Sequence, residues 1–188
     1  MNQKALKVLE YDKIIEVLIE KVSCDLGRAQ CEALVPMHDL EDVRLAQRQT
    51  ADALRRVYAK GSVSFSGTKS VGASLKRLEI GGSLNVTELL TICKLLETAG
   101  RVKQYSRGDE RSDDQKDSLD DYFDALEPCF PLSSEIRRCI LSEDEIADDA
   151  SGNLKSIRRQ MKQLNDKVHS TLSSLLNGSA RNYLQDAV

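Results

Sequence analysis

The chain reads Ser74-Leu75-Lys76-Arg77-Leu78-Glu79-Ile80-Gly81-Gly82-Ser83-Leu84 at a point where one helix is expected to end and another to begin. The paired glycines can adopt backbone conformations that other residues avoid, so the first helix is predicted to stop there. Ser83 or Asn85 can cap the following helix, and Glu88 stands three residues after Asn85, which is the spacing of a capping box. The junction therefore predicts two consecutive helices joined by a short turn.

Helical spacing of apolar residues continues on both sides of this junction. The chain of 188 residues is 40% hydrophobic and only 4% aromatic, and few aromatic residues favour helices over a β-sandwich. The apolar side chains of residues 12–23 are numerous enough to predict burial on a wide face. We therefore predict an all-α fold, a multi-helix core bundle, with helices at residues 3–9, 12–23, 26–34, 39–60, 69–79, 86–104, a segment capped by Ser133 or Ser134 that runs to 141, and a long helix from about 151.

The last long helix carries an apolar seam and is predicted to leave the bundle. Its apolar residues alternate by three and four, which is typical of heptads: Leu154, Ile157, Met161, Leu164, Val168, Thr171 and Leu175. Such a seam either packs on another helix or lies exposed, so it predicts an interaction surface.

The same helix also carries a basic cluster. Lys155, Arg158, Arg159 and Lys162 follow the spacing i, i+3, i+4, i+7, which places them on one face, away from the apolar seam. This basic face can meet the phosphates of a nucleic acid. It can equally be the solvated back of an amphipathic helix, or a partner for the acidic segment that precedes it. No tyrosine or phenylalanine alternates with these cations, so base stacking on this face is not predicted.

Charge is distributed unevenly along the chain, although its net value is only −3. Residues 107–149 hold 15 acidic and 5 basic side chains, whereas residues 150–188 hold 2 acidic and 6 basic side chains. The stretch 107–117 is charged and aperiodic, which predicts a solvated, mobile loop. The chain as a whole is therefore no polycation built to bind DNA.

The sequence also bears on compartment. There is no apolar run of about eighteen residues that could span a membrane. Lys4 and Lys7 interrupt the apolar residues too early for a signal peptide. The 5 cysteines are odd in number and form no CxxC pair, which favours reduced, buried thiols. We expect a cytoplasmic protein without a membrane partner.

Three stretches resemble active-site motifs, but each departs from the pattern it needs. Residues 61–70 have five residues between their glycines, and Thr68 stands where a phosphate-binding loop needs lysine. A helix–helix loop with Phe65 in the core is the simpler interpretation. His38 beside a helix start has no second histidine nearby in the sequence, and the acidic residues 143–149 lack the central glycine of an EF-hand. We predict no catalytic residue, no cofactor-binding residue and no metal ligand in this chain, and we expect Arg77 to pair with Glu79.

Several short motifs occur together in a characteristic order. They are Leu9-Glu10-Tyr11-Asp12-Lys13-Ile14, Ser64-Phe65-Ser66-Gly67, Glu88-Leu89-Leu90, Ser156-Ile157-Arg158-Arg159-Gln160 and Tyr183-Leu184-Gln185-Asp186-Ala187, together with the double-glycine junction. In this order the chain resembles the start of the MutS-two family, the bacterial MutS relatives with a C-terminal Smr nuclease domain. The resemblance runs from about Leu6 to Val188. The acidic insert from Arg107 to Leu119 departs from the family pattern, and so does Gly152, where a residue that opens a helix is expected.

The resemblance implies a domain organisation, with a function for each part, that composition alone does not indicate. Residues 1–150 would be a helical core with an acidic loop near 107–117, and residues 151–188 a protruding C-terminal lever helix that leads toward a DNA-facing clamp. The family's ATPase, its Smr endonuclease, and its ATP and magnesium would lie beyond Val188, where we expect the natural sequence to continue. The implied partners are branched DNA, the ribosome or both, and a second copy of the protein. The implied roles are suppression of recombination and rescue of collided ribosomes.

A second interpretation needs no enzyme. The apolar seam of the last helix can make the chain a stand-alone helical module that dimerises through residues 154–175. A third possibility is direct nucleic-acid binding by the basic face.

Overall fold

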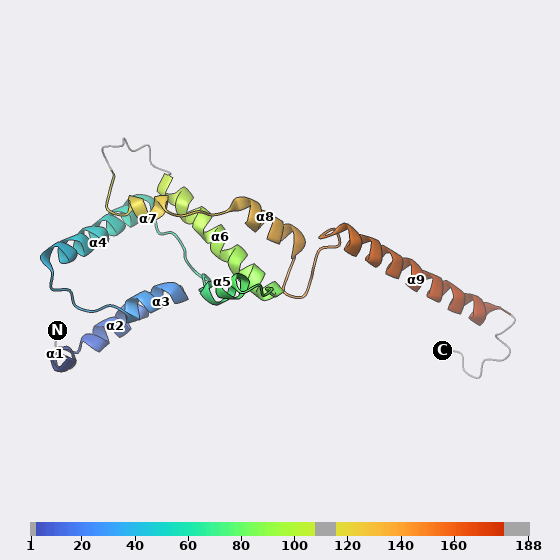
Figure 1. Cartoon of the computed structure of the whole chain (residues 1–188), viewed down its shortest axis with the longest axis horizontal. Helices are drawn as coiled ribbons and strands as arrows, with labels where there is room; N and C mark the ends of the chain where they lie inside the picture. Colours follow the sequence, from blue (N-terminus) through green and yellow to red (C-terminus); the bar gives the residue numbers. More distant parts are fainter. Residues whose placement is uncertain (1–2, 108–115, 179–188) are drawn as a thin grey trace. The chain divides into compact units, whose positions relative to one another are not determined.

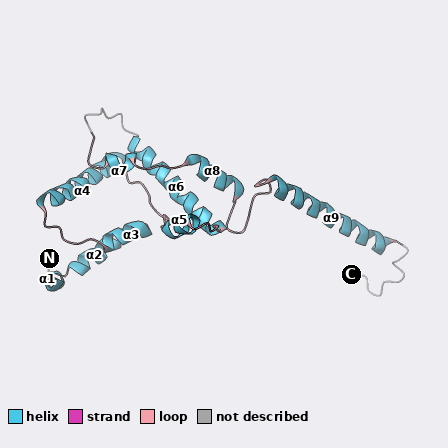
Figure 2. Ribbon diagram, in the orientation of Figure 1, coloured by secondary structure: helices cyan, strands magenta, loops and turns pink. Residues whose placement is uncertain are grey.

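The computed structural model describes residues 3–107 and 116–178, and in these residues the chain folds into helices without strands (Figures 1 and 2). This confirms the predicted all-α fold class. The helices of the described residues are α1 (Gln3–Val8), α2 (Tyr11–Ile19), α3 (Asp25–Glu32), α4 (Leu40–Lys60), α5 (Gly72–Glu79), α6 (Val86–Arg107), α7 (Asp120–Asp124), α8 (Phe130–Cys139) and α9 (Gly152–Asn177). Most of the predicted loop 107–117 lies outside the described residues.

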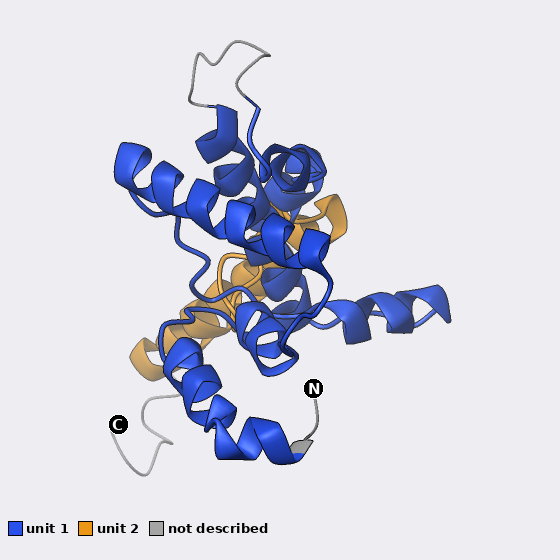
Figure 3. Cartoon of the chain, turned by 90° about the vertical axis from the view of Figure 1, so that its left-hand side faces the viewer, with its two compact units in different colours: residues 1–137 blue, residues 138–188 orange. Residues whose placement is uncertain are grey.

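The chain divides into two compact units, residues 1–137 and residues 138–188, which Figure 3 shows in different colours. Each unit has its own buried apolar residues, among them Val102 and Ile136 in the first and Ile140 and Ala147 in the second. The sequence predicts a helical core up to residue 150 and a lever helix after it. These two units do not test that division, which stays a prediction.

The first three helices contact one another in sequence, α1 with α2 and α2 with α3. The prediction that α2 is buried on a wide face is wrong, because none of its residues is buried and Ile14 and Val17 are exposed. The reason is that its neighbours are short, with six residues in α1 and eight in α3, and cover only part of its apolar surface.

The double-glycine junction folds as predicted. Gly81 has a φ of 78°, its amide donates to the Leu78 carbonyl at 2.9 Å, and the Gly82 amide donates to the Arg77 carbonyl at 2.9 Å. This pair of hydrogen bonds is a Schellman motif, which ends α5. Asn85 and Glu88 then form a reciprocal capping box ahead of α6, since each side chain accepts the other residue's backbone amide at 2.9 Å.

The ion pair predicted at this junction has a different partner. The Arg77 guanidinium binds Glu88 at 2.8 Å rather than Glu79. The prediction failed because residues two positions apart on a helix point in different directions and do not face each other. The observed pair joins α5 directly to the first turn of α6.

A buried ionic cluster fastens α4 to the segment around α7. The Arg56 side chain is 3% exposed and donates to the two carboxylate oxygens of Asp117 at 2.7 and 2.6 Å and to Asp120 at 2.6 Å. Its guanidinium also lies 4.6 Å from the centre of the Phe123 ring, within range of a cation–π interaction. Next to it, the buried carboxylate of Asp52 accepts a hydrogen bond from the backbone amide of Ser118, which lies just before α7.

Helix α8 packs on α6 through both apolar and charged contacts. The Cys93 thiol is fully buried and donates to the Ser133 carbonyl at 3.5 Å, and Arg137 forms a bidentate pair with Glu97 at 2.7 and 3.0 Å. The helix starts at Phe130, earlier than the predicted caps Ser133 and Ser134. Proline at position 131 is tolerated because it falls in the first turn, where its missing N–H has no helical partner.

In the described part of the second unit, the end of α8 leads through a tight turn to α9. Ile140 and Ile146 form an isolated antiparallel bridge, which brings the acidic residues 143–145 into the turn between them. The Ser151 hydroxyl accepts the Leu154 amide at 3.2 Å and caps α9, whose 26 residues extend over about 39 Å at 1.5 Å per residue.

Two expectations from composition can be compared with the structure. All five cysteines are free, but only Cys93 is buried, and Cys129 is exposed, so the prediction of buried thiols is correct for Cys93 alone. None of the helices in the described residues has the length and apolar character needed to cross a membrane.

Candidate functional site

The basic face predicted from the sequence lies entirely on α9. Lys155, Arg159 and Lys162 are exposed, and Arg158 is partly covered. The Arg158 guanidinium forms an ion pair with Asp148 and donates to the Ile146 carbonyl at 2.8 Å. One of the four cations is therefore paired with the acidic segment before the helix. This pairing is one of the alternatives that the sequence left open for the basic face. The other three point to solvent and can meet an anion.

The apolar seam of α9 is solvent-exposed from Ile157 to Leu175, whereas Leu154 at its start is half-buried. Met161 is 64% exposed and Leu164 is 63% exposed, and Ile157, Val168 and Leu175 are exposed as well. The predicted heptad side chains are thus available to a partner. Thr171, the weak position of the seam, donates its hydroxyl to the Lys167 carbonyl at 2.8 Å.

The glycine-rich loop, residues 61–70, lies between the helices α4 and α5. It follows helix α4 where a phosphate-binding loop would follow a strand, in keeping with the sequence interpretation. The expectation that Phe65 fills the core is wrong, because its side chain is exposed. In the same loop, Thr68 is buried, and its hydroxyl has no hydrogen-bond partner among the described residues.

The residues around His38 serve as a helix start. The Asp39 carboxylate accepts the amides of Glu41 and Asp42 at 2.9 and 3.2 Å and so caps α4. Within residues 3–107 and 116–178, no group of three histidine, cysteine or acidic side chains is arranged to hold a metal ion.

Hydrogen bonding and burial shift the pKa values of ionisable groups in the first unit, among them Asp52, Glu97 and Cys93. The hydroxyl and amide of Ser118 hold the pKa of Asp52 below its usual value, and Arg137 does the same for the pKa of Glu97. Burial raises the pKa of the Cys93 thiol. Because these donors favour the charged form of each carboxylate, both carboxylates contribute to the stability of the fold.

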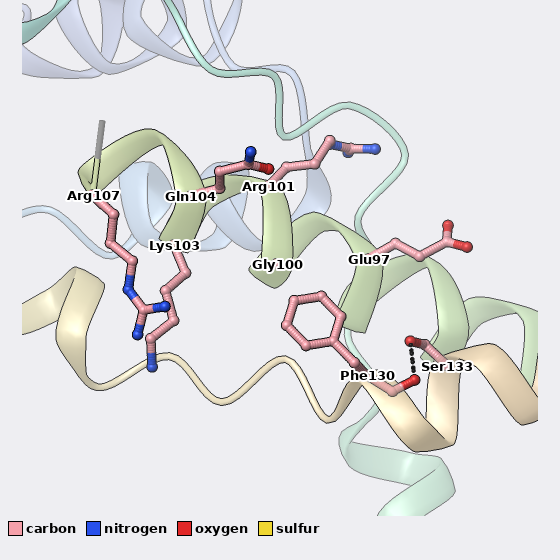
Figure 4. Close-up of a pocket in the computed structure, with 8 residues that line it drawn as sticks. All are labelled: Glu97, Gly100, Arg101, Lys103, Gln104, Arg107, Phe130 and Ser133. Atoms are coloured by element: carbon pink, nitrogen blue, oxygen red, sulfur yellow. Dashed lines mark hydrogen bonds between the residues drawn. The ribbon is translucent and has the colours of Figure 1, made fainter. Parts of the chain in front are cut away.

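A groove between α6 and α8 is a feature that sequence analysis missed. It encloses about 510 Å³, and Figure 4 shows the side chains around it. The walls come from two segments about thirty residues apart in sequence, which no local pattern connects. Its principal lining residues are Gly100, Arg101, Lys103, Gln104, Arg107 and Phe130.

Comparison with known proteins identifies relatives along the full length of the chain. An Endonuclease MutS2 from Agathobacter rectalis is 51% identical over 189 residues, and one from Lachnoclostridium phytofermentans is 49% identical over 193 residues. An Endonuclease MutS2 from Clostridioides difficile is 34% identical over 189 residues. Each match covers 100% of this chain but 23–24% of the relative. No protein-family model matches the chain.

These matches confirm the resemblance that the ordered motifs indicated. The chain spans about a quarter of the length of the curated relatives it matches. Over its full length, the chain is therefore homologous to about a quarter of the length of proteins named Endonuclease MutS2.

Proposed function

We propose that the chain is the non-catalytic core and lever region of a longer, MutS-like ATPase and endonuclease. The observation that carries this proposal is the match of the whole chain, at 51% identity, to about a quarter of an Endonuclease MutS2. In this proposal residues 1–150 form the core, and α9 is the lever that transmits nucleotide-driven motion. A helix of about 39 Å is long enough to connect separate domains.

The activities of the longer protein belong to the same proposal. ATP and magnesium would bind outside this chain, and so would the endonuclease substrate. Branched DNA and the ribosome are the proposed partners, a homodimer is the proposed assembly, and the cytoplasm is the proposed location. The proposed roles are suppression of recombination and rescue of collided ribosomes.

Incubating the purified chain with ATP, magnesium and branched DNA tests the non-catalytic role. We expect neither ATP hydrolysis nor strand cleavage above the blank, whereas the full-length A. rectalis relative serves as the active control. Hydrolysis or cleavage by the chain itself would contradict the proposal.

A proline within α9 tests the lever directly. Proline in a helix interior costs about 3 kcal/mol and breaks the hydrogen bonding of the helix. We expect Leu164→Pro, placed at the aligned position of the A. rectalis protein, to keep basal ATPase activity but to remove its response to DNA. Leu164→Met at the same position is the control and should leave that response intact. An unchanged response in the proline variant would argue against a lever.

The second candidate function is dimerisation through α9, and the exposure of Met161 and Leu164 favours it. Light scattering on the full chain and on the Leu164→Asp variant measures whether the chain dimerises. If the variant keeps its helical content but no longer forms a dimer, the result would support dimerisation through α9. Gln163→Asp, which lies off the apolar seam and about 100° around α9 from Leu164, is the matched control for added charge. A chain that is monomeric without any substitution removes this candidate.

Nucleic-acid binding by the basic face is a third possibility, and the exposure of three of its four cations supports it. Reversing Lys155, Arg159 and Lys162 to glutamate should weaken binding to DNA and reduce the salt dependence by about three charges. Lys167→Glu, which lies off this face on the same helix, should change binding less. Equal loss in both variants would indicate non-specific attraction.

A further inference from the structure

The groove between α6 and α8 contains an aromatic ring that is held in place and left open. Phe130 is 61% exposed although it is the first residue of α8. Its ring lies against α6 at Gly100, and a Cβ built on Gly100 would approach the ring to 2.9 Å. Figure 4 shows this close approach. The ring thus has one side against a bare stretch of helix backbone and remains accessible from the groove.

The backbone before Phe130 contributes to this placement. Cys129 has a φ of 41°, in the left-handed region that residues other than glycine rarely adopt. Its carbonyl accepts the amides of Leu132 and Ser133 at 3.0 and 3.2 Å, so the strained residue starts α8. Such strain is maintained only where surrounding contacts impose it. Here it accompanies an exposed ring in a groove.

Cations line the same side of α6 as the ring. Lys103 and Arg107 lie three and seven residues after Gly100, on the helix face that carries the ring. Figure 4 shows both side chains extending on the side of α6 where Phe130 lies. A second hollow of about 320 Å³ shares Lys103, Arg107 and Phe130 with the first. The ring and the two cations therefore border one continuous hollowed surface.

Two acidic side chains near the groove are already paired among the described residues. Glu97 is held by Arg137 in a bidentate pair, and Glu127 lies 3.7 Å from the Lys103 ammonium. That ammonium also donates to the Leu126 carbonyl at 2.5 Å, which fixes the α7–α8 connection on α6. Lys103 thus supplies positive potential from a fixed position, and exposed Arg107 is the cation that can reach an anion directly.

We propose that this groove binds one nucleotide unit, with the base stacked on Phe130 and the phosphate held by Arg107 near Lys103. An aromatic platform beside cations is the arrangement that single-stranded nucleic acids use, because every base has a face that stacks and every phosphate carries charge. The helical rise places Arg107 about 10 Å along α6 from Gly100, and its long side chain reaches back toward the ring. A free nucleotide and a nucleotide within a strand share this chemistry.

Fluorescence anisotropy of the full chain with a labelled oligothymidylate of about 8 nucleotides tests the proposal. We expect Phe130→Ala to weaken binding about tenfold or more, and Phe130→Trp to keep it. Arg107→Glu should weaken binding and lower its salt dependence. Tyr58→Ala and Arg48→Glu remove an exposed aromatic ring and reverse an exposed cation on α4, and both should bind like the unaltered chain.

Gly100→Ala provides a test that alters no proposed ligand. The added methyl group should displace the Phe130 ring and weaken binding, whereas alanine by itself favours helix formation in α6. Circular dichroism checks that each variant keeps its helices. Weakened binding with intact helices supports the proposal.

Competition experiments distinguish the possible sources of the nucleotide. Displacement of the probe by thymidine monophosphate assigns the groove to a single nucleotide, and displacement by the oligomer alone makes it part of a strand-binding surface.

The proposal is overturned by an absence of binding, by unchanged binding in Phe130→Ala, or by equal binding of an abasic oligomer. Equally effective competition by polyglutamate would assign the groove to an acidic protein segment and would also overturn it. Loss of binding on reversal of Lys155, Arg159 and Lys162, with normal binding in Phe130→Ala, would place the nucleic acid on α9.

Discussion

The guanidinium of Arg77 in α5 lies 2.8 Å from the carboxylate of Glu88 in the first turn of α6. The same carboxylate accepts the Asn85 amide at 2.9 Å, so Glu88 takes part in both an ion pair and a capping box. The end of one helix is in this way bound to the beginning of the next.

Substitutions at Glu88 should separate these two contributions. Glu88→Gln keeps the capping box but loses the ion pair, and because the pair is partly exposed we expect a loss of about 0.5 kcal/mol. Glu88→Ala loses both and should cost about 1–2 kcal/mol. Urea denaturation of both variants measures the difference. Equal losses would mean that the capping box contributes nothing to stability.

The left-handed turn after α5 leads to a second prediction. Gly81→Ala should destabilise the first unit by about 1–2 kcal/mol, because alanine is strained at a φ of 78°. Gly72→Ala at the other end of α5 is the matched control. Gly72 has no positive φ and its added Cβ meets nothing closer than 3.7 Å, so we expect a gain of about 0.4–1 kcal/mol. Thermal unfolding of both variants gives the comparison, and a neutral Gly81→Ala would be unexpected.

The cluster around Arg56 predicts a large difference between neighbouring arginines. Arg56→Met would remove the buried cation that binds Asp117 and Asp120, and we expect a loss of about 3–5 kcal/mol. Arg55→Met removes an arginine that is 71% exposed, and it should cost less than about 1 kcal/mol. Denaturation gives both values, and hydrogen exchange should show the loss of protection at residues 116–124 in the first variant. Similar losses in both variants would contradict the ionic role of Arg56.

The lowered pKa of Asp52 predicts how stability depends on acid. A carboxyl group whose pKa is lower in the folded state contributes stability above its unfolded pKa, and this contribution disappears as the pH falls through the folded pKa. Glu97 adds a contribution of the same sign. We expect stability to fall below about pH 4, and to fall less steeply in Asp52→Asn. Denaturation at a series of pH values tests this. If the free energy of unfolding depends on pH in the same way in the unaltered chain and in Asp52→Asn, Asp52 does not contribute to the loss of stability in acid.

The cysteines should differ in reactivity. Burial raises the pKa of the Cys93 thiol and closes it to solvent, whereas Cys129 is exposed. Since the thiolate is the reactive form, maleimide should label Cys129 much faster than Cys93. Mass spectrometry of the labelled chain over time measures both rates. Labelling of Cys93 should accelerate in denaturant, and fast labelling without denaturant would contradict its burial.

The sequence predicted the helices well because their signals are local. Paired glycines, the spacing of Asn85 and Glu88, and the cap at Asp39 each act within four residues, and the structure has all of them. The heptad spacing likewise predicted α9 and its apolar seam.

Features that depend on distant residues were not predicted. Arg56 meets Asp117 across 61 positions, and Phe130 meets Gly100 across thirty, so neither pair leaves a trace in the spacing of nearby residues. The role of Phe65 was wrong because the sequence shows that a ring is apolar but not whether the fold covers it. Glu79 could have been excluded as the partner of Arg77, because residues at i and i+2 of a helix do not face each other.

The close approach of Phe130 to Gly100 has a consequence for how this protein can vary. A methyl group at position 100 and a ring lying as it does here cannot occupy the same space. The two positions should therefore change together among homologues, with any larger residue at 100 accompanied by a smaller or more flexible one at 130. An aromatic residue at 130 that always accompanies glycine at 100 would indicate that the placement of the ring matters. Other large apolar residues at 130 would indicate that only its volume matters.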